Sequence, residues 1–253
     1  MAPLGESMTT FQSLPGSDSD FMIAVLGGFC LYWGQHVRGV PGASQRLLAF
    51  LALHGRMVKR AAVAGTLWPD ASERNAYSNL RSAIARLKSM ASKVLVASKL
   101  ELGLADGVTV DLRFARELAR RLLDPAVTPE PSELGMAAVG ALSHDVLPDW
   151  YDDWALIEAE DWRQLRLHAL EALAGHLTAV GRWGEAVVAA SAAVRADPLR
   201  ESGRAALIQV HLAHGNQSEA VREFARYREL LATELGLAPT PRLHQLIRSL
   251  QTR

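Results

Sequence analysis

Residues 71–90 read ASERNAYSNLRSAIARLKSM, and this stretch decides how the first half of the chain is interpreted. An α-helix repeats every 3.6 residues, so side chains three and four positions apart share one face. One face of this stretch is apolar and must pack against a core; its members are Ala76, Leu80, Ala83, Ile84 and Leu87. The stretch therefore predicts a helix of about residues 71–90 with one buried side. Asp70 and Glu73 predict a capping-box start.

The opposite face of this helix is small and polar, and arginines border it. It carries Arg74, Asn75, Ser78, Ser82, Ala85 and Ser89, with Arg81 and Arg86 at its edges. Small side chains let a helix approach bases and sugars closely, while guanidinium groups reach phosphates or guanine edges. The face therefore suits the major groove of DNA. A solvated amphipathic helix with ordinary surface arginines is the alternative.

The segments around this helix predict the order of elements in a winged helix. In residues 21–40, apolar and β-branched residues alternate between glycine breaks, which indicates two or three short strands. Ser44 is predicted to cap a helix that ends near Gly55, and residues 58–68 predict a second helix closed by Pro69. Strands at 94–96, 100–104 and 108–110 follow. The order predicts a winged helix-turn-helix of the response-regulator output type.

Other basic and polar residues extend the predicted DNA contact beyond the helix face. Lys88 lies near the end of the helix, and Lys93, Ser98 and Lys99 lie around the following hairpin. A wing uses such residues to touch the DNA backbone or minor groove. Lysines that keep an edge strand from aggregating explain them equally well. Arg46, near the start of the first helix, is a further candidate for a phosphate contact, although surface solubility explains it nearly as well.

Charge is distributed unevenly between the two halves of the chain. The formal net charge of the 253 residues is zero. Residues 20–115 carry twelve Lys and Arg against six Asp and Glu, a net charge of +6. Residues 116–253 carry fifteen against nineteen, a net charge of −4. This asymmetry is expected if only the first half meets a polyanion.

The second half is predicted to be almost wholly helical, with an internal repeat. GRWGEAV at 181–187 recurs as GNQSEAV at 215–221, an offset of 34 residues. This offset is the tetratricopeptide period, in which a glycine separates two helices and a small alanine lets them pack closely. The predicted fold is mainly α with a small β region. Its parts are a disordered tail at 1–19, a winged-helix domain at 20–115 and a tetratricopeptide-like domain at 116–253.

Several functional classes find no support in the sequence. Cys30 is the single cysteine, so a disulfide framework within the chain is excluded and a reducing cytoplasm fits. The chain has neither a signal peptide pattern nor an apolar run long enough to span a membrane. His211 and His214 have helical metal-ligand spacing but no third ligand, so surface histidines are the better interpretation. We therefore predict no enzyme activity, cofactor or metal.

The chain resembles the Streptomyces antibiotic regulatory protein family over roughly residues 21–250. The motifs LGGF, RLLAFLALHG, LWPD and NAYSNLRSAIARLK carry the resemblance in the first half. DWYDDW, GRWGEAV, DPLRE and GNQSEAVREFARYRELLATELGLAPTPRLHQL are similar to the bacterial transcriptional activator domain of that family. The ending ELGLAPTPRLHQL is the most specific, since Gly236 is predicted to end a helix and Pro241 to begin the next.

The resemblance implies a function. Members of the family bind direct repeats in double-stranded promoter DNA upstream of secondary-metabolite genes and recruit the RNA polymerase holoenzyme. It also implies a homodimer on DNA, a cytoplasmic and nucleoid-associated location, and no membrane partner. By position, the recognition helix then comprises Arg74, Asn75, Ser78, Arg81, Ser82 and Arg86. The alternative is a tetratricopeptide-type adapter whose winged helix binds protein, since a fold alone does not establish a function.

Overall fold

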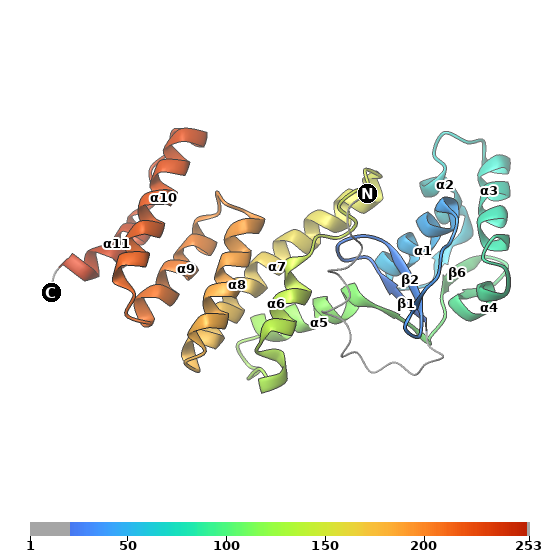
Figure 1. The fold of residues 1–253 in the computed structure, drawn as a ribbon. Helices are drawn as coiled ribbons and strands as arrows, with labels where there is room; N and C mark the ends of the chain where they lie inside the picture. The colour runs from blue at the N-terminus through green and yellow to red at the C-terminus, as the bar shows by residue number, and fades with distance from the viewer. Residues whose placement is uncertain (1–20, 252–253) are drawn as a thin grey trace. The chain divides into compact units, whose positions relative to one another are not determined.

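The computed structural model describes residues 21–251, and the tail predicted at 1–19 lies outside them. The described chain is mostly helical, with a small β region at its start, which confirms the predicted fold class. Contacts divide it into two compact units (Figure 1). The first comprises residues up to 114 together with 144–162, and the second comprises 115–143 together with 163 onward. The predicted domain boundary at residue 115 stays a prediction.

The first unit contains two small sheets. One has the strand order β3-β2-β1-β7, formed by β1 (Phe21–Ala24), β2 (Cys30–Trp33), β3 (His36–Val37) and β7 (Val108–Val110). β1 pairs antiparallel with β2 and parallel with β7. The other sheet has the order β4-β6-β5, formed by β4 (Val58–Lys59), β5 (Leu95–Ala97) and β6 (Glu101–Leu104). β5 and β6 form the hairpin of the wing, whereas β7 leaves it for the first sheet.

Helices α1 (Gly42–His54), α2 (Arg60–Leu67) and α3 (Glu73–Ala85) complete the winged helix. α1 ends where Gly55 adopts a left-handed conformation and donates its N–H to the Leu51 carbonyl. The apolar face predicted for α3 is confirmed at Ala76, Leu80, Ala83 and Leu87, which are buried, while Ile84 is half-buried. A short η1 (Lys88–Met90) and α4 (Ala91–Val94) follow. The predicted helix at 71–90 therefore ends earlier, at residue 85.

Ser44 joins α1 to α3 and does not cap α1 as predicted. The cap position is Pro41, which offers no side-chain hydrogen bond. Ser44 is fully buried instead, and its hydroxyl donates to the Ala83 carbonyl at 2.8 Å. A residue pattern along one helix gives no sign of such a partner on another helix.

Replacing Ser44 with alanine should lower the free energy of unfolding by about 1–2 kcal/mol, because a buried hydrogen bond is lost. Urea denaturation followed by circular dichroism measures this change. Ser89→Ala, at an exposed serine, is the control and should change little. Equal stabilities of Ser44→Ala and the wild type would show that this bond does not secure α1 against α3.

Residues 144–162 pack on the first unit although they lie far along the chain. Leu26 and Val146 form an antiparallel bridge, and the Gly27 N–H donates to the Asp145 carbonyl at 2.7 Å. Tryptophans add to the contact: Trp154 meets Phe50 edge to face at 5.4 Å. The buried Trp162 donates from Nε1 to the His144 carbonyl at 2.9 Å. The first unit therefore uses a segment that local sequence patterns assign to the helical half.

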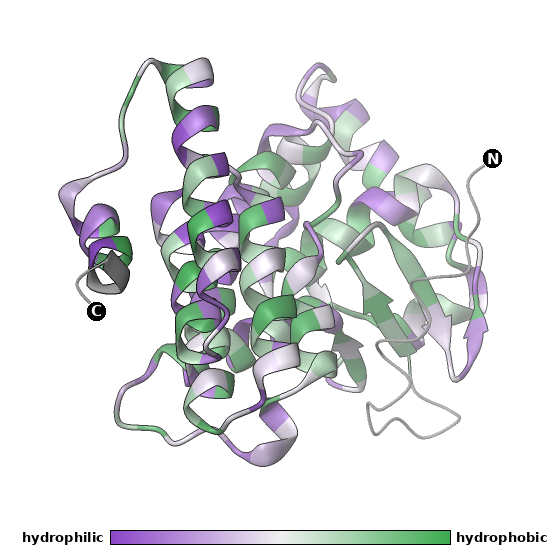
Figure 2. Cartoon of the chain, turned by 60° about the vertical axis from the view of Figure 1, so that its left-hand side comes forward, coloured by the Kyte–Doolittle hydropathy of each residue, from purple (hydrophilic) through white to green (hydrophobic). Residues whose placement is uncertain are grey.

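The second unit is built only of helices in the described residues. Its elements are α5 (Asp111–Leu123) from residue 115, η2 (Pro131–Glu133), α6 (Met136–Ser143), α7 (Asp153–Ala179) from residue 163, α8 (Trp183–Ala196), α9 (Glu201–Ala213), α10 (Gln217–Leu235) and α11 (Pro241–Gln251). α9 packs between α8 and α10. In Figure 2 most helices carry both hydrophobic and hydrophilic residues, as amphipathic helices do, whereas the central strands are mainly hydrophobic.

The 34-residue repeat appears in this unit as two matching turns. Gly181 and Gly215 have φ of +75° and +83°, a conformation that glycine adopts readily. α8 and α10 begin two residues after these glycines, and Ala186 and Ala220 at their inner faces are fully buried. The helix pairs predicted from the repeat are thus present. No described helix has the length and apolarity needed to cross a bilayer.

Candidate nucleic-acid interface

The polar face of α3 is open to solvent. Every residue predicted for that face and its edges is exposed: Arg74, Asn75, Ser78, Arg81, Ser82 and Ala85 on α3, Arg86 at its C-cap, and Ser89, which lies beyond the helix on η1. The helix turns its apolar side into the unit. Arginines therefore line an exposed strip of small residues, the α3 strip, which is formed by Asn75, Ser78, Ser82 and Ala85. Apart from the arginines, no large side chain stands on this strip, which leaves it able to approach a flat or grooved partner closely.

Contacts with two helices hold α3 in place. α1 and α2 both pack against it, and the Ser44 hydroxyl binds its last turn. The capping box predicted from Asp70 and Glu73 is not formed, because the cap position is Ser72 and no side chain caps the helix. The helix begins with a backbone hydrogen bond alone, in which the Ala76 N–H donates to the Ser72 carbonyl at 2.8 Å.

The α3 face is strongly basic and lacks neutralising acids. Residues 71–100 contain six Lys and Arg and a single acid, Glu73. Within the part of the chain that the structure describes, no carboxylate lies within ion-pair distance of Arg74, Arg81 or Arg86. Lys88, exposed just beyond the helix, has φ of +53°, so the chain turns sharply there. The arrangement offers several unneutralised cations to an anionic partner.

The wing presents one cation and one apolar residue at its tip. Lys99 and Leu100 are exposed, Leu100 by 77%. Ser98 is exposed too, but its hydroxyl oxygen accepts the backbone N–H groups of Leu100 at 3.2 Å and Glu101 at 2.9 Å. Arg60 donates from Nε to the Ser98 carbonyl at 3.0 Å. Ser98 therefore has a part in shaping the turn, which the sequence pattern did not indicate.

Lys93 lies on the face of an aromatic ring. Its Nζ is 4.7 Å from the centre of the Trp33 ring, and Arg38 Cζ is 4.8 Å from the same ring. Arg38 was not among the residues selected from the sequence. It follows the short strand β3, and only the fold brings it and Lys93 to the same ring.

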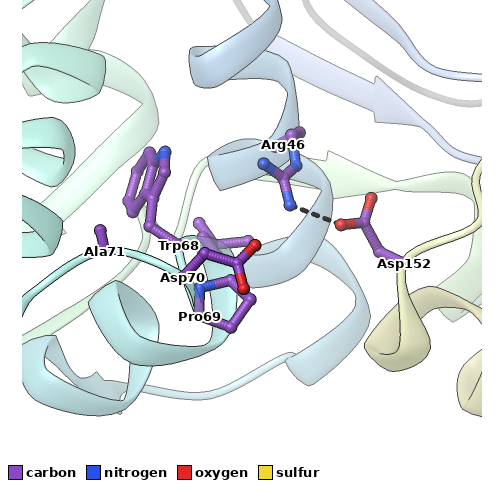
Figure 3. Close-up of a pocket in the computed structure, with 7 residues that line it drawn as sticks. Arg46, Trp68, Pro69, Asp70, Ala71 and Asp152 are labelled. Atoms are coloured by element: carbon purple, nitrogen blue, oxygen red, sulfur yellow. Dashed lines mark hydrogen bonds and ion pairs between the residues drawn. The ribbon is translucent and has the colours of Figure 1, made fainter.

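Arg46, a predicted phosphate contact, forms an ion pair within the first unit. Its Nη2 donates to Asp152 Oδ1 at 2.5 Å, and both side chains are about two thirds buried. Figure 3 shows this pair at the side of a pocket whose other wall is the α2–α3 turn, with Trp68, Pro69, Asp70 and Ala71. The Asp152 carboxylate neutralises the positive charge that Arg46 was predicted to offer to a phosphate. Arg46 is therefore less available to a phosphate than the unpaired arginines of α3.

No group of three or more potential metal ligands occurs among residues 21–251 as far as they are described. His211 and His214, which have helical metal-ligand spacing, lie near the end of α9, and the ring of His214 stacks on Trp183 at 5.4 Å. The chemistry that the exposed α3 strip can perform is binding, by cations and small polar groups.

The sequence is similar to a known domain family and to two curated regulatory proteins. The sequence model of the bacterial transcriptional activator domain matches residues 110–251. A regulatory protein AfsR of Streptomyces griseus is 28% identical over 248 residues, covering 92% of this chain and 25% of its own length. A regulatory protein AfsR of Streptomyces coelicolor is 29% identical over 220 residues, covering 82% and 22%. The chain spans about a quarter of the length of these curated relatives.

One solved structure resembles the whole described fold. Mycobacterium tuberculosis EmbR, in complex with a low affinity phosphopeptide, superposes with a TM-score of 0.70 at 22% sequence identity. The match covers 92% of this chain and 65% of that one. At this identity the likeness concerns the fold, and it extends across both the winged helix and the helical unit.

Proposed function

The chain belongs to the bacterial transcriptional activator domain family, and from that premise we propose that it binds promoter DNA through α3 and activates transcription. The resemblance to the Streptomyces antibiotic regulatory proteins is confirmed, and that family consists of transcriptional regulators rather than enzymes. The finer parts of the proposal are binding to direct repeats, recruitment of the RNA polymerase holoenzyme and control of a secondary-metabolite gene cluster. Two copies would bind one promoter, in the cytoplasm on the nucleoid.

One observation carries the proposal: the exposed, unpaired arginines along the small-residue strip of α3. A helix enters the major groove only if bulky side chains do not hold it away, and the strip meets this condition. Arg81 and Arg86 can reach phosphates or guanine edges from its margins and Arg74 from the first turn of the helix, while Asn75, Ser78 and Ser82 face the bases. The exposed Lys88 and Lys99 add positive charge that can contact the phosphate backbone of the DNA. A protein-binding adapter has no need for this concentration of positive charge.

Binding to DNA should be strongly dependent on salt. Each neutralised phosphate contributes about −0.9 to the slope of log K against log salt concentration. With roughly four to six contacts for each copy, we expect a slope of about −4 to −5 for each bound copy. Fluorescence anisotropy with a fragment selected from random DNA, at several salt concentrations, measures the slope.

The selected fragment also tests sequence specificity. Its affinity should exceed that of a scrambled duplex by at least ~10³-fold, as for other specific DNA-binding proteins. A protein that selects no sequence and shows a flat salt dependence would instead favour the adapter. Retention of a protein partner after nuclease treatment would strengthen that alternative.

A further inference from the structure

Trp33 gathers two cations from separate parts of the first unit. Trp33 ends β2, Arg38 follows β3 and Lys93 lies on α4. The two cations lie 4.8 Å and 4.7 Å from the centre of the Trp33 ring. The negative face of an aromatic ring attracts cations and holds their side chains in a limited set of positions. These positions are therefore set by the fold rather than by chance on a mobile surface.

The platform under the two cations is itself secured. Phe21 and Trp33 are paired across β1 and β2, and their rings stack at 5.5 Å with an interplanar angle of 12°. The backbone N–H of Arg38 donates to the Leu31 carbonyl at 2.7 Å, which holds the start of that side chain against β2. Beside Lys93, Val94 is fully buried and its carbonyl accepts the Ala105 N–H at 3.0 Å. Both cations thus extend from anchored backbone.

The two cations lack a counter-charge. In the described chain, no carboxylate lies within ion-pair distance of Arg38 or Lys93, and both side chains are exposed. Two like charges close to one ring repel each other, and an anion that contacts both of them would reduce that repulsion. A phosphate suits such a place, because an arginine and a lysine can both donate to its oxygens.

We propose that Trp33, Arg38 and Lys93 form a phosphate-binding site that takes a backbone phosphate of the DNA outside the bases read by α3. The inference rests on the proposed function, and it assigns to Arg38 and Trp33 roles that sequence patterns did not suggest. Lys93 follows the end of α3 by eight residues and lies on α4, which the short η1 joins to α3. Arg38 and Lys93 touch the phosphate, and Trp33 is a positioning residue that acts through them.

The test compares Arg38→Ala and Lys93→Ala with wild type in salt titrations on the selected DNA fragment. Each substitution should reduce the magnitude of the salt slope by about 1. Each should also weaken binding by roughly fivefold on the selected and the scrambled duplex alike, because a phosphate contact carries no sequence information. Arg228→Ala, at an exposed arginine of α10, is the matched control and should leave the slope unchanged.

Trp33 variants separate positioning from structure. Trp33→Leu should reduce the slope in the wild-type background but have no further effect once Arg38 and Lys93 are both alanine. Trp33→Phe keeps an aromatic face and should restore most of the slope. A Trp33→Leu effect that persists in the Arg38→Ala/Lys93→Ala background would overturn the positioning role.

Two further outcomes overturn the assignment to DNA. If wild type binds DNA through the α3 arginines but the Arg38→Ala/Lys93→Ala variant keeps the full salt slope, this site is wrong while the proposed function stands. If that variant instead loses binding of free pyrophosphate, measured by calorimetry, with DNA binding unchanged, the phosphate belongs to a small molecule. A wild-type protein that binds no DNA at all would show that the proposed function has failed first.

Discussion

Replacing Arg74, Arg81 and Arg86 together with alanine should weaken binding to the selected DNA by about a thousandfold. Each arginine is expected to contribute about 1–3 kcal/mol through a phosphate or a guanine edge. The three lie along one exposed strip of α3, and no described carboxylate competes for them. Fluorescence anisotropy at one fixed salt concentration measures the loss.

The triple variant should remain folded, because none of the three side chains contributes to the core. Its free energy of unfolding should stay within about 1 kcal/mol of wild type. Arg195, Arg228 and Arg242 provide a matched control: they are also exposed and belong to the second unit. Their combined replacement removes the same charge and should weaken binding only slightly. Equal losses for the two triple variants would mean that overall charge, and not the α3 face, drives binding.

Replacing Asp111 with alanine should lower the free energy of unfolding by about 3–5 kcal/mol. Asp111 is fully buried at the start of α5, and its carboxylate accepts the backbone N–H groups of Val25, Leu26 and Leu112 at 2.7–3.0 Å. These bonds tie the end of β1 to the junction of β7 and α5. Without the carboxylate, three buried donors would lack an acceptor, and each costs about 1–3 kcal/mol. Urea denaturation measures the effect, with the exposed Asp106→Ala as control.

Asp111 should also affect how stability depends on pH. Burial raises its pKa from 3.8 to about 6, although the three backbone N–H groups act to lower it. The folded chain therefore holds this proton more tightly than the unfolded chain does. The resulting stabilisation, roughly 3 kcal/mol, is complete below about pH 4 and is lost as the pH rises through 6. Asp111→Asn, which does not titrate, should lack this decline. An identical pH profile for wild type and Asp111→Asn would contradict the assignment.

The sequence predicted α3 and its two faces because both follow from the 3.6-residue period of one helix. Leu80 and Leu87 are buried and Arg81 is exposed, as the wheel requires. The two repeat turns were predictable for the same reason, since Gly181 and Gly215 recur at a fixed offset. Each of these features depends only on residues that are near one another in the chain.

What the sequence did not predict depends on partners far along the chain. Ser44 binds a carbonyl 39 residues away, and Asp152 neutralises Arg46 from 106 residues away. β1 pairs in parallel with β7, although nearly the whole winged helix lies between these two strands in the sequence. Arg38 and Lys93 both reach the ring of Trp33 although they are 55 residues apart in the sequence. Local periodicity carries no information about such pairings, so functional residues that depend on them require the folded structure.

The central claim is that the exposed face of α3 lies in a groove of bound DNA, and cleavage from a tethered metal chelate tests it most directly. Cys30 is the single cysteine, so a Cys30→Ser background allows one thiol to be placed at will. With iron-EDTA attached to Ser82→Cys, we predict strand breaks clustered at the deoxyriboses that flank one major groove within the selected site. The same reagent on Arg228→Cys should give no such local breaks. Cleavage from Ser82→Cys no greater than from Arg228→Cys would contradict the account.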